Sequence, residues 1–216
     1  AWGTIREAWL KNFELQGCPR CSNVGVSKEE AEVADYVRFL GFVVEKYKFE
    51  ERVTRPKEID IYVSEKKIGI EYCGLYFHGE RSGKDRNYHK KKMDMAAKEG
   101  VQLLTVFSHE WNTRKEQVKG FIMSKLGKNQ VTVFARKTEI RKLDQKIARE
   151  FLESYHMQGA TRVQVAFGLF LGGELLAVVS GSEHRRIGGQ FSLNRLCFKP
   201  GVTVVGGSSK LNKALV

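Results

Sequence analysis

Two acidic side chains on neighbouring apolar segments are the residues best suited to chemistry. Asp60 is the third residue of EIDIYV (58–63), and Glu71 is the fourth residue of IGIEYC (68–73). Carboxylate oxygens are hard ligands of the kind that Mg²⁺ binds. A cation held there would acidify a bound water and neutralise charge on a phosphate. The pair therefore predicts a divalent-cation site suited to phosphodiester hydrolysis.

Two histidines follow these acids and could move protons. His78 ends an aromatic run, and His89 lies in the first turn of a basic, helix-forming segment. Histidine has an ordinary pKa that suits proton transfer near neutral pH. The alternative is that both acids lie on the solvent-facing side of an amphipathic hairpin, since each stands between apolar residues.

The elements that must position these residues can be read from the apolar pattern. Segments 58–63 and 68–73, joined by the polar residues 64–67, predict a β-hairpin that places Asp60 and Glu71 on paired strands. The neighbouring elements expected are a helix over 27–40, a strand over 42–49, a helix over 87–99, a strand over 101–107 and a helix over 113–126. This order predicts an α/β core with a mixed sheet.

Two of these elements carry more specific expectations. In the helix over 87–99 we expect Met93, Ala96 and Ala97 to face inward and the lysine run to face outward. The strand over 101–107 is almost continuously apolar, which is typical of the buried middle of a sheet.

Glu30 has two interpretations. Ser27 followed three residues later by Glu30 is the pattern of a capping box at a helix start. A carboxylate at a helix start near a metal could also orient a ligand or a water. Both roles are compatible.

The stretch from residue 18 to residue 111 resembles the very-short-patch repair endonucleases and the related EDxHD phage homing endonucleases, within the PD-(D/E)xK nuclease superfamily. The resemblance implies a metal-dependent DNA endonuclease that uses Mg²⁺ or Mn²⁺. It implies that Asp60, Glu71 and the main-chain carbonyl of Tyr72 bind the cation. It also implies that His78 is the active-site histidine, acting as general base or proton shuttle, and that Glu30 is the early helical glutamate.

The chain departs from the family pattern at two positions. Cys73 replaces the superfamily lysine, so another group must stabilise transition-state charge, and Lys92, one helical turn after His89, is the candidate. His89 replaces an aspartate, which leaves open whether one metal or two are bound.

The charge balance favours a polyanionic partner. The formal net charge is +12, and the basic residues are clustered. We expect double-stranded DNA to be bound by Arg81, Lys84, Arg86, Lys90, Lys91, Arg185 and Arg186. A further basic group comprises Arg136, Lys137, Arg141 and Lys142. Cationic faces can also be merely solvated, but here they surround the carboxylates and imidazoles.

The sequence offers no sign of a membrane protein or of a secreted one. No apolar run approaches the roughly 20 residues needed to span a bilayer, and the first residues lack the order of a signal peptide. Four cysteines do not resemble a secreted disulfide framework. We expect a cytoplasmic protein, in a bacterial host cell if it is phage-encoded.

Residues 1–26 form an N-terminal segment with half of a zinc motif. Cys18 and Cys21 give a C-x-x-C on a tight turn, resembling the zinc half-ribbon that precedes many such phage nucleases. The other ligands could have lain upstream, or Cys73 or a histidine could complete a Zn²⁺ site. The pair could also be a free dithiol.

The pattern changes after residue 127, and we place a domain boundary there, with a nuclease domain over 27–127 and a smaller α+β domain over 131–216. The second domain should contain a helix over 142–156 and strands at 131–135, 163–171, 174–181, 190–198 and 202–205. We expect a tight turn at Gly172-Gly173.

The order of the second domain loosely resembles the front half of the GNAT acetyltransferase fold, truncated at its last helix. That resemblance implies a pyrophosphate-binding loop at Gly206–Lys210, although Ser208 or Ser209 could simply cap the helix. A DNA-tethered acyltransferase and a catalytically silent DNA-binding protein are therefore alternatives. The endonuclease is preferred because only it explains why acids, imidazoles and lysines occur together.

Overall fold

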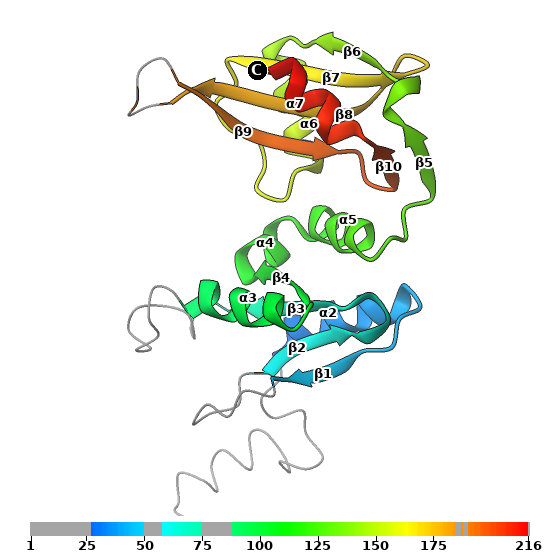
Figure 1. The fold of residues 1–216 in the computed structure, drawn as a ribbon, viewed down its shortest axis with the longest axis vertical. Coiled ribbons are helices and arrows are strands. Elements are labelled where there is room, and N and C mark those ends of the chain that lie inside the picture. Colours follow the sequence, from blue (N-terminus) through cyan, green and yellow to red (C-terminus); the bar gives the residue numbers. More distant parts are fainter. Residues whose placement is uncertain (1–26, 50–57, 75–87, 185–186, 188–189, 216) are drawn as a thin grey trace, which may run out of the picture.

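The computed structural model of the chain describes residues 27–49, 58–74, 88–184, 187 and 190–215 (Figure 1). Several residues of the predicted sites lie outside the described part of the chain. They are Cys18, Cys21, His78, Arg81, Lys84, Arg86, Arg185 and Arg186.

The first sheet is mixed, as predicted. It contains β1 (Glu45–Lys48), β2 (Glu58–Val63), β3 (Ile68–Cys73) and β4 (Gln102–Phe107), in the order β1-β2-β3-β4. Strands β2 and β3 are antiparallel, which confirms the predicted hairpin, and β3 runs parallel to β4.

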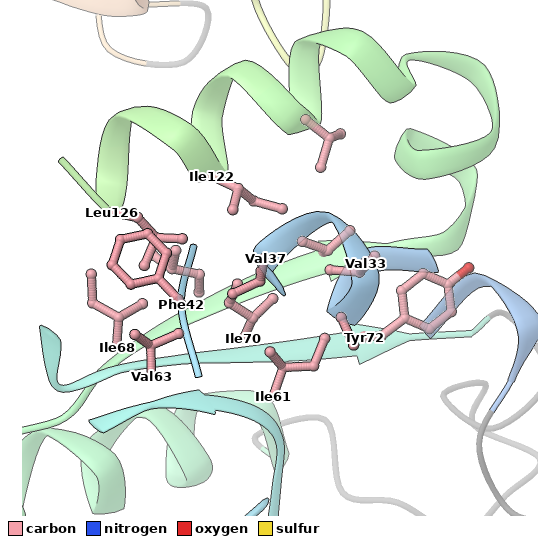
Figure 2. Packing of buried hydrophobic residues seen from close by; sticks show 14 of the residues in the cluster. Val33, Val37, Phe42, Ile61, Val63, Ile68, Ile70, Tyr72, Ile122 and Leu126 are labelled. Atoms are coloured by element: carbon pink, nitrogen blue, oxygen red, sulfur yellow. The ribbon is translucent and has the colours of Figure 1, made fainter. Parts of the chain in front are cut away.

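Helices cover both faces of this sheet (Figure 1). They are α2 (Lys28–Phe39), α3 (Tyr88–Lys98), α4 (Ser108–Thr113) and α5 (Lys115–Lys125). Figure 2 shows one face, where Val37 of α2 and Ile122 near α5's end pack onto Ile70. On the other face Ala96 of α3 packs with Ile59 and Leu103.

Two expectations about these elements are wrong. Strand β4 is at the edge of the sheet rather than in its middle. Its apolar run is still explained, because Leu103 and Leu104 are buried in clusters on opposite faces. The predicted strand over 42–49 is shorter, at 45–48. The predicted helix over 113–126 is present as α5, and the short helix α4 before it was not predicted.

The inward face of α3 is also different from the one predicted. Met93 is 48% exposed and Ala97 is exposed, whereas Lys92 is only 3% exposed. His89, Lys92 and Ala96 are spaced three and four residues apart and therefore share one side of the helix. This side faces the sheet.

The rest of the chain forms two further sheets. Strands β5 (Val131–Phe134) and β10 (Val202–Val205) form a parallel pair. An antiparallel sheet has the order β6 (Glu139–Lys142), β7 (Val165–Leu171), β8 (Glu174–Glu183) and β9 (Phe191–Phe198). The sequence analysis missed β6, a short edge strand whose sequence EIRK is mostly polar.

Two helices pack against the antiparallel sheet (Figure 1). Leu152 of α6 (Gln145–Tyr155) is buried with Val178, and Leu211 of α7 (Gly207–Leu215) is buried with Ala177. Successive residues of β8 point to opposite faces, so α6 and α7 cover opposite sides. The expected Gly172-Gly173 turn is present, with φ angles of +57° and +87°. Among the described residues, no helix is both long and apolar enough to cross a membrane.

Candidate active site

Asp60 and Glu71 lie at the same end of the β2–β3 hairpin. Ile61 pairs with Ile70, the residue before Glu71, and the main-chain N–H of Tyr72 donates to Asp60 Oδ2 at 3.0 Å. Glu71 is only 5% exposed, and Asp60 is partly buried. The alternative of a solvent-facing pair is therefore wrong for Glu71.

Lys92 joins these acids from helix α3. Its Nζ donates to Glu71 Oε2, and the two side chains are 4% and 7% exposed. The charge of Lys92 also acts on Asp60. Two acids from the hairpin and one ammonium group from α3 thus form a single buried charge cluster.

Burial disfavours the ionised forms of two acids at this site. Burial raises the pKa of Asp60, an effect opposed by the Tyr72 N–H bond and by the positive charges of Lys92 and Lys46. The pKa of Glu30 on α2 is also raised, first by burial and then by the negative charge of Asp60. Glu30 therefore lies within electrostatic range of Asp60, and a cation beside Asp60 would favour the ionised form of both acids.

Glu30 also contributes to the start of its helix. Its main-chain N–H donates to Ser27 Oγ at 3.0 Å, so Ser27 is the N-cap of α2. The Ser27 half of the predicted capping box is confirmed. The electrostatic effect of Asp60 on Glu30 is in keeping with the second role, near the acids.

His89 and Cys73 meet at the end of β3. Cys73 Sγ lies 3.8 Å from His89 Nδ1, and the imidazole packs edge-on against the ring of Phe107 at 6.2 Å between centroids. His89 and Lys92 therefore approach the sheet from the same side of α3. Cys73, at the position where the sequence resemblance would expect lysine, is a buried thiol.

The exposed side of α3 is basic. Lys90 and Lys91 are exposed on the same helix whose other side carries Lys92. On β1, Lys46 is exposed and lies 3.9 Å from a carboxylate oxygen of Glu58. Exposed cations thus flank the acidic cluster on two elements.

The donor set suits a hard divalent cation. Asp60 and Glu71 offer carboxylate oxygens, the ligands that Mg²⁺ and Mn²⁺ prefer. In the described part of the chain, no three or more histidine, cysteine, aspartate or glutamate side chains are grouped so as to hold a metal ion. Asp60 and Glu71 can therefore supply some, but not all, of the ligands of such a cation.

The segment from Gly206 to Lys210, where the glycine turn leads into α7, has a structural role through Lys210. Ser208 and Ser209 lie inside the first turn of α7, after Gly206, rather than at its N-cap. Lys210 Nζ donates to the carbonyls of Ala135, at 2.8 Å, and Thr138. Lys210 therefore ties α7 to the segment between β5 and β6, while pyrophosphate binding by this turn stays a prediction.

Sequence reasoning named Lys92 but missed its partner, Glu71. A signal was present, because Lys92 is four residues before Ala96, which the sequence itself predicted to face inward. Residues four apart lie on one side of a helix, which indicates an inward Lys92. The contribution of Lys46 was missed entirely, and an exposed strand lysine gives no comparable signal.

Comparison with known proteins yields one structural likeness. No family model and no curated protein sequence matches the chain. Among solved structures, the chain is similar to the catalytic domain of the homing endonuclease I-Bth0305I, at 22% sequence identity. The alignment covers 47% of this chain and 95% of that domain, with a TM-score of 0.36.

Proposed function

We propose that the protein is a metal-dependent endonuclease that hydrolyses phosphodiester bonds in double-stranded DNA, cutting one strand or both. The observation that carries the proposal is the buried cluster of Asp60, Glu71 and Lys92, next to a helix whose outer side is basic. Asp60, a partly buried acid with a raised pKa beside a specific charge partner, is the kind of residue that marks a candidate functional site.

Asp60, Glu71 and the main-chain carbonyl of Tyr72 are the groups proposed to hold Mg²⁺ or Mn²⁺. When bound, the cation supplies an acidified water and neutralises charge on the scissile phosphate. Asp60 lies close enough to Glu30 to raise the pKa of Glu30, and Glu30 would orient a water or a ligand.

The remaining roles follow from charge and position. His78 would act as general base or proton shuttle, with His89 assisting, and Lys92 would stabilise charge on the phosphate. Backbone phosphates would be bound by Arg81, Lys84, Arg86, Lys90, Lys91, Arg185 and Arg186. In biological class, we propose a phage-type homing endonuclease of the bacterial cytoplasm, with a mismatch-repair nickase as the alternative. We also propose Zn²⁺ at Cys18 and Cys21.

Cleavage of a duplex in Mg²⁺ by Asp60→Asn tests the proposal. Asparagine keeps an acceptor for the Tyr72 N–H but loses the charge that holds the cation. We expect the cleavage rate to fall on the order of 1000-fold, because a ligand that positions the cation is worth several kcal/mol in the transition state.

Asp35→Asn is the matched control, since Asp35 is exposed on α2 and paired with Arg38 at 2.7 Å. It should cleave like the wild type. His78→Ala should also be strongly impaired. Full activity in both Asp60→Asn and His78→Ala would show that this cluster is not the active site.

A further inference from the structure

We propose that Lys92 is an internal counter-ion of the active site. In the cation-free protein its ammonium group holds Glu71, and a divalent cation must displace it from that carboxylate in order to bind. The inference rests on the proposed function in one respect, because it takes Glu71 to be a cation ligand.

The first observation is the burial of the pair. Lys92 Nζ donates to Glu71 Oε2 while the two side chains are only 4% and 7% exposed. An ion removed from water needs a compensating partner, so each group depends on the other. A divalent cation bound to Glu71 would supply this compensating positive charge in place of the ammonium group.

The second observation is the charge around the pair. Lys92 donates to Glu71 and its charge also acts on Asp60, so the ammonium group serves two carboxylates. A divalent cation carries twice the charge of the ammonium group and favours the same oxygens. The two therefore compete for one position.

The third observation is the attachment of Lys92 to α3. Ala96, one turn further along, is completely buried against the sheet and fixes the helix there. The lysine backbone is therefore held, while its four-carbon side chain can rotate. On release from Glu71, the ammonium group would be available to a substrate phosphate near the cation, so that cation binding prepares the site for DNA.

Calorimetric titration of Mn²⁺ into Lys92→Met at pH 8, without DNA, tests the inference. Methionine is a similarly long, unbranched and uncharged side chain. We expect Mn²⁺ to bind on the order of tenfold more tightly, because a competing positive charge within a few ångströms is removed. DNA cleavage by this variant should nevertheless fall.

Lys98→Met is the matched control, since it removes a charge from the exposed last turn of the same helix. It should bind Mn²⁺ like the wild type. Unchanged or weaker binding by Lys92→Met would overturn the inference, as would failure of both proteins to bind millimolar Mn²⁺. Tighter binding without any cleavage activity in the wild type would instead remove only the proposed function.

A second measurement uses the wild-type chain, in case Lys92→Met does not fold. Reductive methylation followed by mass spectrometry reports how accessible each lysine amine is. We expect Mn²⁺ to increase the methylation of Lys92 and to leave that of Lys98 unchanged. Equal protection of Lys92 with and without Mn²⁺ would contradict displacement of its ammonium group.

Discussion

At the scale of single residues, Asp60 lies in surroundings that disfavour the ionised form of its carboxyl group. Burial raises its pKa above the ordinary value of 3.8, despite the hydrogen bond from Tyr72 and the positive charge of Lys92. The folded protein therefore binds a proton at Asp60 more readily than the unfolded chain. The contribution of Asp60 to stability is complete below pH 3.8 and is lost as the pH rises through the raised pKa.

This linkage predicts that Asp60→Asn stabilises the protein at pH 7 while strongly reducing cleavage. We expect a melting temperature a few degrees higher, on the scale of roughly 2–4 °C per kcal/mol for a chain of this size. The measurement is thermal unfolding of wild type and variant between pH 3.5 and 8 without divalent cations. The gain should shrink toward the acid end, and an equal or lower melting temperature at pH 7 would contradict it.

At the scale of elements, the site depends on how closely α3 and its sheet pack. Gly69 on β3 lies two residues before Glu71, under the cluster of Ile59, Leu103 and Ala96. A Cβ built on Gly69 would meet Ile59 Cγ2 at 2.8 Å and Leu103 Cδ1 at 3.2 Å. The absence of a side chain at Gly69 is therefore required by the packing beneath α3.

We predict that Gly69→Ala destabilises the protein by about 1–3 kcal/mol, the usual cost of overpacking a buried site. Because the strain lies close to Glu71, the cleavage rate should fall as well. Denaturant unfolding measures the first effect and a duplex cleavage assay the second. Gly74→Ala is the control for stability, since an added Cβ there would meet none of the described residues within 4 Å. Equal stability of the two variants would argue against this packing.

At the scale of the whole molecule, Arg114 joins the part of the chain that contains the first sheet to helix α6. Arg114, between α4 and α5, pairs with Glu153 Oε1 at 2.5 Å and donates to the main-chain carbonyls of Glu153 and His156. Gln117 of α5 donates to the Ser154 carbonyl at 2.9 Å. These bonds hold α5 against the C-terminal end of α6, beside a cavity of about 510 Å³.

His156 and Cys197, which line this cavity, stay uncharged at neutral pH. Burial, helped by the charges of Arg195 and Arg114, lowers the pKa of His156 to about 4. Burial raises the pKa of the Cys197 thiol to about 12. At neutral pH these two groups therefore supply neither a proton donor nor a thiolate nucleophile in the cavity.

We predict that Arg114→Ala loosens the junction and destabilises the protein by about 1–2 kcal/mol. Most of this loss comes from the two carbonyl bonds, because the Glu153 side chain is 60% exposed and its ion pair is screened by water. Scanning calorimetry should show a broader or divided transition, and limited proteolysis should become faster near residues 127–130.

Arg141→Ala serves as the control, since Arg141 pairs with Glu139 within its own strand. It should unfold like the wild type. Identical calorimetric transitions and proteolysis rates for the two variants would show that Arg114 does not hold the junction.

The sequence by itself determined the local elements and the acids they carry. Alternation in 58–63 and 68–73 is a property of a few consecutive residues, so it predicted the hairpin and placed Asp60 and Glu71 on paired strands. The same holds for the Ser27 cap and for the mixed sheet implied by the order of elements. Whether the C-terminal part is a separate domain stays a prediction.

Only the tertiary structure decided which sides of these elements meet. The inward position of Lys92 depends on its contact with Glu71, 21 residues away in the sequence. Strand β4 is an edge strand because, among the described residues, no further strand pairs with it beyond β3. Periodicity along the chain records that an element has a buried side, but it does not record the partner. The partner is set by packing between distant segments, where one favourable ion pair can outweigh the usual preference of lysine for water.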